Sequence, residues 1–294
     1  MRVEEFFPIR ELEAQSGVKS STLRAWERRY GLIKPNRTPK GHRLYSQSDL
    51  ARVSRIKELL EDGHSFTSIK KTINHANVGN ETEIAYTNVW NEAIANIKNS
   101  VSDFSYNRMD SFYNDIVSLY PVDLVSEKLL QPLLQYYSQV SAEITELSFF
   151  NKWLQIRLSS RFHHDNIKNK NAKKVIFVSD FNKETSLMMM SNMIITLGYQ
   201  ALFFGSLLPY NKLKKVSEKS ASKAIFTAPS KLQVKDPQFL DFINKSDNPI
   251  FIFGDFDKQS YSDIFKPSNV YYLGNSIPVA INLFRKHMLN LYHE

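Results

Sequence analysis

The chain of 294 residues contains no cysteine and only nine glycines. Without cysteine it forms neither disulfides nor metal sites built on thiolates. No stretch has the 18 or more consecutive apolar residues of a transmembrane helix, and the N-terminus lacks the apolar run of a signal peptide. We therefore expect a cytoplasmic protein that has no membrane partner.

The motifs of common catalytic sites are also missing. The chain has no Gly-x-Gly-x-x-Gly loop, Walker loop or nucleophile elbow, and its carboxylates form no recognisable catalytic pair. His163, His164 and Asp165 invite a metal-site interpretation. Adjacent residues on a helix point about 100° apart, however, so three in a row do not converge on one ion. We expect no catalytic residue and no metal site, and we interpret the protein as a non-enzyme.

Residues 9–30 have the apolar spacing of two short amphipathic helices. Leu23 and Trp26 are three residues apart and Tyr30 follows four residues later, in agreement with the helical period. Gly17 provides a tight turn between the two helices. Helix, turn and helix together form the helix-turn-helix pattern.

The other face of the second helix carries candidate DNA contacts. With the apolar residues turned inward, we expect Thr22, Arg24, Arg28 and Arg29 to face outward. Hydroxyl and guanidinium groups in that position can reach phosphates or base edges.

Residues 32–45 have the pattern of two short strands around a turn punctuated by proline and glycine. Lys40, His42 and Arg43 make this hairpin basic. A basic hairpin beside a helix-turn-helix is a wing, which can grip the DNA backbone next to the recognition helix.

This region resembles the DNA-binding domain of the MerR family of transcriptional regulators. The shared pattern is Thr-Leu-Arg, aromatic-Glu, Arg-Tyr-Gly-Leu, Gly-His-Arg-x-Tyr and Ser-x-x-Asp-Leu, within residues 6–76. The resemblance implies DNA contacts by side chains of both the recognition helix and the wing. The full set of predicted contacts is Thr22, Arg24, Arg28, Lys40, His42, Arg43 and Tyr45. For Tyr45, a packing role is the alternative.

Positive charge is concentrated in the same part of the chain. Residues 1–76 contain 15 Lys or Arg and 9 Asp or Glu, whereas the rest of the chain contains 23 and 21. The first part therefore carries +6 of the total net charge of +8. A basic region of this kind attracts phosphates in a salt-sensitive manner, which favours double-stranded promoter DNA as the partner.

The remaining chain divides into a helical and a mixed region. Residues 81–169 keep a helical apolar period, which predicts a bundle of about four helices. Residues 172–294 alternate short apolar strands with helices, which predicts a doubly wound, flavodoxin-like (Rossmann-like) parallel sheet. With the winged helix-turn-helix at residues 1–76, we predict a multidomain α and α/β protein of three domains.

This order of domains resembles the light- and vitamin B12-dependent repressors of carotenoid genes. The resemblance implies that the bundle and the Rossmann-like domain hold cobalamin and that ligand state sets oligomeric state. The family's loop Asp-x-His-x-x-Gly corresponds here to a segment that begins at Asp180. Asn182 replaces the histidine that ligates cobalt, and Thr185 replaces the glycine. An amide is a poor cobalt ligand compared with an imidazole.

The second half of the family's cobalamin site also differs. Its Trp, followed ten residues later by Glu-His, aligns with Tyr137, Leu147 and Ser148, while Thr227 and Gly254 follow later strands. The candidate ligand-pocket residues are Asp180, Asn182, Thr185, Tyr137, Ser148, Thr227 and Gly254. We expect no cofactor, although the domain type alone leaves cobalamin possible.

Two functions remain open from the sequence. The first is a DNA-binding transcriptional regulator, which we expect to be a repressor. Its C-terminal part would form dimers or higher oligomers and respond to a regulatory protein partner or an unidentified ligand. The alternative is a regulator gated by cobalamin or another cofactor, in which light could be the signal.

Overall fold

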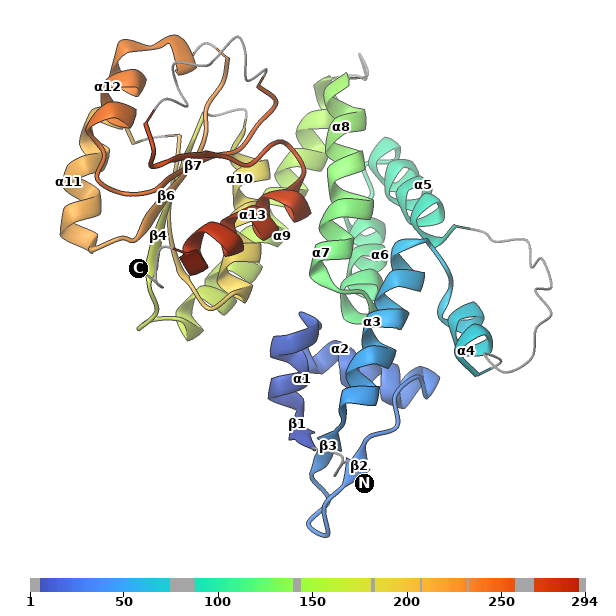
Figure 1. The fold of residues 1–294 in the computed structure, drawn as a ribbon. Helices are drawn as coiled ribbons and strands as arrows, with labels where there is room; N and C mark the ends of the chain where they lie inside the picture. The colour runs from blue at the N-terminus through green and yellow to red at the C-terminus, as the bar shows by residue number, and fades with distance from the viewer. Residues whose placement is uncertain are drawn as a thin grey trace. The chain divides into compact units, whose positions relative to one another are not determined.

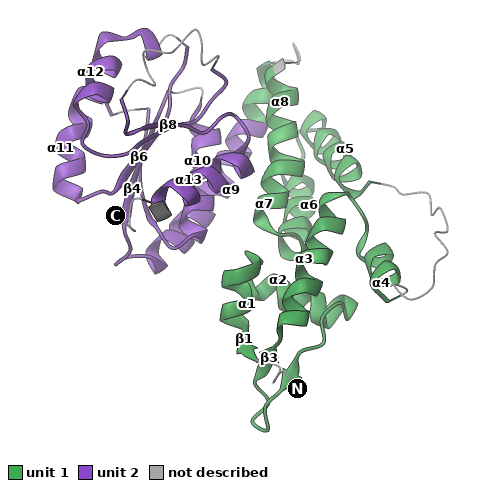
Figure 2. Cartoon of the chain, in the orientation of Figure 1, with its two compact units in different colours: residues 1–149 green, residues 150–294 purple. Residues whose placement is uncertain are grey.

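The computed structural model describes residues 6–74, 88–139, 144–180, 183–206, 208–231, 233–256 and 267–290. The chain divides into two compact units, residues 1–149 and residues 150–294 (Figure 2). Within the described residues, no helix combines the length and the apolar character that a membrane span requires.

The first unit begins with a winged helix-turn-helix (Figure 1). Its elements are β1 (Phe7–Pro8), α1 (Ile9–Ser16), α2 (Ser20–Ala25), the π-helical turn η1 (Trp26–Tyr30), β2 (Asn36–Arg37), β3 (Arg43–Tyr45), α3 (Gln47–Glu61) and α4 (Phe66–Asn74). Gly17 ends α1 with a φ of +71°, a conformation in which glycine carries no steric cost. The three strands form an antiparallel sheet in the order β1-β3-β2. The predicted helices and hairpin are confirmed, and β1 is an addition to them.

Further helices complete the first unit. They are α5 (Val89–Ser102), α6 (Tyr106–Leu119), α7 (Val122–Leu124), the π-helical turn η2 (Val125–Leu130) and α8 (Gln131–Gln139). The long helix α9 (Ile144–Lys168) begins in the first unit and continues in the second. This region is helical as predicted, but the structure groups the winged domain with α5–α8 instead of separating them.

Buried aromatic side chains explain this grouping. The indole N–H of Trp26 donates a hydrogen bond to the Leu119 carbonyl at 2.7 Å. Phe66 stacks on Tyr30 with ring centroids 4.4 Å apart and lies 5.0 Å from Tyr120. Trp90 packs against Tyr120 in turn, at 4.9 Å. The winged domain and the start of the helical region therefore share one apolar core.

The second unit is a parallel sheet covered by helices. Its strands are β4 (Lys174–Ser179), β5 (Gln200–Gly205), β6 (Ala224–Ala228), β7 (Ile250–Ile252) and β8 (Val270–Tyr272). They lie in the order β5-β4-β6-β7-β8, and every adjacent pair is parallel. This arrangement confirms the predicted doubly wound, flavodoxin-like class.

Helices alternate with these strands along the chain. They are α10 (Glu184–Thr196), α11 (Tyr210–Ser220), the short 3-10 turn η4 (Gln233–Lys235), α12 (Pro237–Lys245) and α13 (Ile277–Asn290). Helices α11 and α12 cover one face of the sheet, and α10 and α13 cover the other (Figure 1). On the second face Phe226 packs between Phe177 and Phe251, and the ring of Phe284 from α13 lies 5.0 Å from both Phe226 and Phe251.

Candidate DNA-binding surface and ligand site

The recognition helix consists of α2 and its π-helical continuation η1. Leu23 and Trp26 are buried in the core, whereas Arg24, Arg28 and Arg29 are exposed, as expected from the helical period. Three guanidinium groups are thus available on this helix for phosphates or base edges.

Thr22 is the exception on this helix. Its side chain is only 5% exposed, so the prediction that it faces outward is wrong. Helix α2 contacts both α1 and α6, and these contacts cover a wider arc of its surface than the local apolar spacing indicates. The structure therefore favours a packing role for Thr22 over a DNA contact.

The wing is a short, firmly closed hairpin. Within it, the Thr38 amide donates to the His42 carbonyl at 2.9 Å, and the His42 amide donates to the Thr38 hydroxyl at 3.0 Å. Gly41 adopts a φ of +81°, which suits the turn. Lys40 and His42 are exposed at the tip, where both remain candidate contacts to DNA.

Arg43 is engaged within the protein. Its Nε donates to Oε2 of Glu27 at 2.7 Å, and Nη2 of Arg37 lies 3.2 Å from the other carboxylate oxygen. The hydrogen bond to Glu27 raises the pKa of Arg43. The wing is thereby tied to the recognition helix, and the predicted contact of Arg43 with DNA would compete with this ion pair.

Tyr45 lies in the core of the small sheet. It pairs with Phe7 across β1 and β3 and is 1% exposed. Burial raises the pKa of Tyr45, and the nearby carboxylate of Glu27 adds to this effect. The structure therefore favours the packing role of Tyr45 over a DNA contact.

Two residues of this surface were missed by the sequence analysis. Glu27 is an acidic residue in a helix meant to meet phosphates, and its side chain is 17% exposed. Arg37 lies directly opposite Arg43 in the β2–β3 register. An acidic residue inside so basic a segment was the available signal, because such a carboxylate needs a local partner.

The carboxyl ends of the strands are where ligands bind in doubly wound sheets. Here the Asp180 amide donates to the Ala228 carbonyl at 3.2 Å, which links the ends of β4 and β6. Asn182 lies outside the described residues. Thr185 is buried in the first turn of α10, and its hydroxyl accepts a hydrogen bond from Gln155 at 3.2 Å.

Thr227, at the end of β6, faces a tyrosine. The hydroxyls of Thr227 and Tyr210 are 3.3 Å apart, and Thr227 is 0% exposed. Tyr210 packs against Phe239 and Phe242, with ring centroids 4.8 and 5.6 Å away. Burial raises the pKa of Tyr210 to about 12. Aromatic side chains of the protein itself therefore fill the space beside Thr227.

Gly254, after β7, is covered in the same way. A Cβ atom added there would lie 2.6 Å from the Phe256 ring. The Tyr272 hydroxyl donates to the Gly254 carbonyl at 2.8 Å and accepts a hydrogen bond from the Phe256 amide at 3.2 Å. The glycine leaves room for a ring of this chain.

The other two candidate pocket residues belong to the first unit. Tyr137 is buried, which raises its pKa, and Ser148 is exposed. Taken together, the candidate residues do not fit cobalamin held in the manner of the resembling family. Aromatic rings cover Thr227 and Gly254, and Asn182 replaces the histidine ligand.

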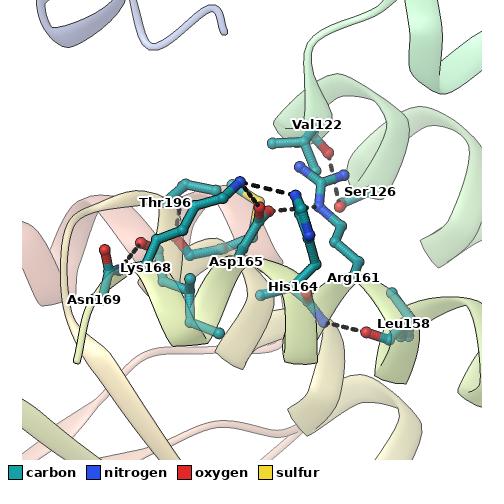
Figure 3. A network of polar contacts seen from close by, with 12 residues as sticks. Val122, Ser126, Leu158, Arg161, His164, Asp165, Lys168, Asn169 and Thr196 are labelled. Carbon is teal, nitrogen blue, oxygen red and sulfur yellow. Dashed lines mark hydrogen bonds and ion pairs between the residues drawn. The ribbon is translucent and has the colours of Figure 1, made fainter.

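Side chains in the histidine-rich turn of α9 form a network of polar contacts (Figure 3). Nζ of Lys168 lies 2.9 Å from Nε2 of His164 and 3.2 Å from the Asp165 carboxylate. Arg161 approaches the same carboxylate at 3.6 Å. Among the described residues, no group of three or more potential metal ligands comes together. The Asp165 carboxylate is therefore the partner of two cationic side chains, Arg161 and Lys168.

Comparison with known proteins bears on the DNA-binding surface. The family model of the MerR HTH family regulatory protein matches residues 7–76. We refer to this matched segment as the MerR domain, and its described residues, 7–74, form the winged helix-turn-helix of the fold. The motif-based prediction over residues 6–76 is thereby confirmed for this part of the chain.

Curated transcriptional regulators are similar to part of this chain. HTH-type transcriptional regulator MlrA of Escherichia coli (strain K12) is 39% identical over 72 residues, which are 24% of this chain and 30% of MlrA. HTH-type transcriptional repressor CarH of Myxococcus xanthus is 24% identical over 162 residues, or 50% of this chain and 53% of CarH. The chain spans about a third to about half of the length of these relatives. The match to CarH extends beyond the MerR domain and supports the resemblance noted from the sequence.

Two solved structures resemble the chain weakly. A cobalamin-binding protein from Desulfitobacterium hafniense DCB-2 has a TM-score of 0.34 at 10% identity and covers 67% of this chain and 89% of its own. The methanol:cobalamin methyltransferase complex MtaBC from Methanosarcina barkeri has a TM-score of 0.31 at 12% identity, with coverages of 74% and 90%.

Proposed function

We propose that this protein is a DNA-binding transcriptional regulator that acts as a repressor in the cytoplasm. The observation that carries the proposal is the MerR domain with its exposed basic groups. Arg24 and Arg28 on the recognition helix and Lys40 and His42 on the wing are all exposed. The relatives that share this domain are named as transcriptional regulators and repressors. The proposed activity is binding, without catalysis.

The proposed mechanism divides the work between helix and wing. The recognition helix enters the major groove, where Arg24 and Arg28 reach base edges or phosphates. The wing tip lies along the adjacent backbone, where Lys40 and His42 contact phosphates. Phosphate contacts supply salt-dependent affinity and base contacts supply the preference for one sequence.

Oligomerisation is part of the proposal. One domain of this size presents one recognition helix, so two copies are needed to read a palindromic site. We propose that the part of the chain after the MerR domain brings the copies together. A regulatory protein or an unidentified ligand would act by changing this assembly.

A selection experiment tests the proposed function. The purified full chain is incubated with a library of fragments from its own genome, and bound fragments are sequenced and titrated by fluorescence anisotropy. We expect enrichment of a palindromic sequence upstream of a gene, bound by an even number of protein copies. Recovery of fragments without a common sequence would contradict the proposal.

A cofactor-gated regulator is the second candidate function. The order of domains, which resembles that of the B12-dependent repressors of carotenoid genes, favours it, whereas the filled space beside Thr227 and Gly254 argues against cobalamin. Mixing the protein with adenosylcobalamin in the dark, followed by desalting, separates the candidates. We expect a colourless protein, and retained visible absorbance at one equivalent would establish the second candidate instead.

A further inference from the structure

Glu27 joins the two parts of the MerR domain that are proposed to touch DNA. It lies in η1 of the recognition helix, and each of its carboxylate oxygens contacts one arginine of the wing. Arg37 comes from β2 and Arg43 from β3, so a single side chain holds both strands of the hairpin.

The two arginines need such a partner. Arg37 and Arg43 are directly opposite in the antiparallel register. Like charges directly opposite each other destabilise a strand pair. The carboxylate between them offsets this repulsion and turns two repelling side chains into one bridge from the wing to the helix.

Glu27 is itself firmly positioned. The preceding residue, Trp26, is 0% exposed and hydrogen-bonded through its indole to Leu119. The following turn is closed by the Gly31 amide, which donates to the Glu27 carbonyl at 3.0 Å. The carboxylate therefore projects from a rigid segment, which makes it a fixed anchor for the wing.

Electrostatics alone argues against an acidic residue at this place. A carboxylate on a phosphate-binding surface repels DNA, so its loss by itself raises affinity for any sequence. A contribution from fixed geometry has the opposite sign, because the helix and the wing bind neighbouring features of one duplex. The two effects can therefore be told apart by the direction of the change.

We propose that Glu27 is a positioning residue for DNA recognition: its carboxylate holds Arg37 and Arg43 so that the wing tip and the recognition helix meet one duplex at a fixed separation. This inference rests on the proposed function. It assigns sequence preference in part to a residue that touches no DNA.

The test uses the full chain, the fragment recovered by selection and a scrambled duplex of the same length. Glu27→Gln keeps the size of the side chain and removes its charge. We expect affinity for the selected fragment to fall about tenfold, as for loss of a strongly coupled contact. Affinity for the scrambled duplex should stay the same or rise.

Glu58→Gln is the matched control. Glu58 is exposed on α3, where it pairs with Arg55, and its loss changes the net charge by the same amount. We expect Glu58→Gln to leave the ratio of the two affinities unchanged. Glu27→Asp, which keeps the charge, should restore part of the lost preference.

Arg37→Gln keeps the inference testable if Glu27→Gln unfolds, because the Arg37 side chain is 52% exposed. Loss of a phosphate contact would weaken both duplexes equally and reduce the salt slope by about one. Loss of positioning instead lowers affinity for the selected fragment alone. Equal weakening of both duplexes, or an unchanged ratio for folded Glu27→Gln, would overturn the inference. If the wild-type chain itself prefers no fragment, the proposed function fails first.

Discussion

The wing of the MerR domain and the carboxyl edge of the parallel sheet are the two places where the sequence predicts a bound partner. In the wing, Lys40 and His42 remain exposed on a hairpin that Glu27 ties to the recognition helix. At the sheet edge, Thr227 and Gly254 are covered by the rings of Tyr210 and Phe256. The wing is a rigid hairpin with exposed charged groups. At the sheet edge, side chains of the chain itself fill the space.

The difference lies in which side chains are left exposed and which are covered by other residues of the chain. A surface for a polyanion needs exposed cations in a fixed arrangement. A pocket for a large flat cofactor needs space that remains when the ligand is absent. Resemblance to a family predicts where a DNA-binding surface or a cofactor pocket would lie. Whether that surface is exposed or that pocket is open depends on the side chains around it.

The largest expected effect concerns the scaffold of the first region. Trp26→Ala removes a fully buried ring and its hydrogen bond to the Leu119 carbonyl. We expect a loss of about 3–5 kcal/mol in the free energy of unfolding, as for other large aromatic truncations. Urea denaturation followed by circular dichroism measures this, and DNA binding should fall with it. A loss below 1 kcal/mol would mean that the first unit does not depend on this core.

The next prediction concerns the packing of the second region at alkaline pH. Tyr210 has a pKa of about 12 in the folded protein, against an ordinary value of 10.0, because it is buried. Below pH 10 the hydroxyl is protonated in both states, and this contribution to stability is fully present. As pH rises from 10 towards 12, only the unfolded chain ionises, so stability is lost.

We expect the share of Tyr210 alone to reach about 1.4 kcal/mol at pH 11 and about 2 kcal/mol at pH 12. Tyr210→Phe should abolish this share, whereas the shares of Tyr120 and Tyr137, whose pKa values burial also raises, remain in the first unit. Denaturation midpoints at pH 8 and pH 11 measure the effect. Identical pH dependence of Tyr210→Phe and wild type would contradict the burial of this hydroxyl.

The smallest effect separates the two groups of exposed cations. Arg24→Ala should weaken binding of the selected fragment by about tenfold and reduce its preference over the scrambled duplex. Lys40→Ala should weaken both duplexes by a similar, smaller factor and flatten the salt dependence. Anisotropy titrations at several salt concentrations measure both. An unchanged preference for Arg24→Ala would remove this side chain from sequence readout.

Local patterns in the sequence predict the folds of both regions. The MerR motif is a run of neighbouring residues, so residues 6–76 are recognisable without any tertiary information. Continuous apolar runs likewise mark β4 to β8, because parallel strands are buried on both faces. What these patterns specify is the backbone and which of its apolar residues face a core.

The side-chain partners depend on contacts that no local pattern contains. Thr22 is buried on a helix, α2, that contacts α6, far along the chain, as well as α1. Arg43 contacts Glu27 only after the hairpin has folded back over the recognition helix. Tyr210 covers Thr227 from the first turn of a helix on the neighbouring layer. The candidate sites could therefore be located from the sequence, but their occupation by the chain's own residues could not.

Sequence-specific DNA binding by this chain is measured by the ratio of two affinities of the full chain. One is for a fragment selected from its own genome and the other is for a scrambled duplex of equal length, both at one salt concentration. We predict that the selected fragment binds about a thousandfold more tightly or better. Equal affinity for the two duplexes would contradict it.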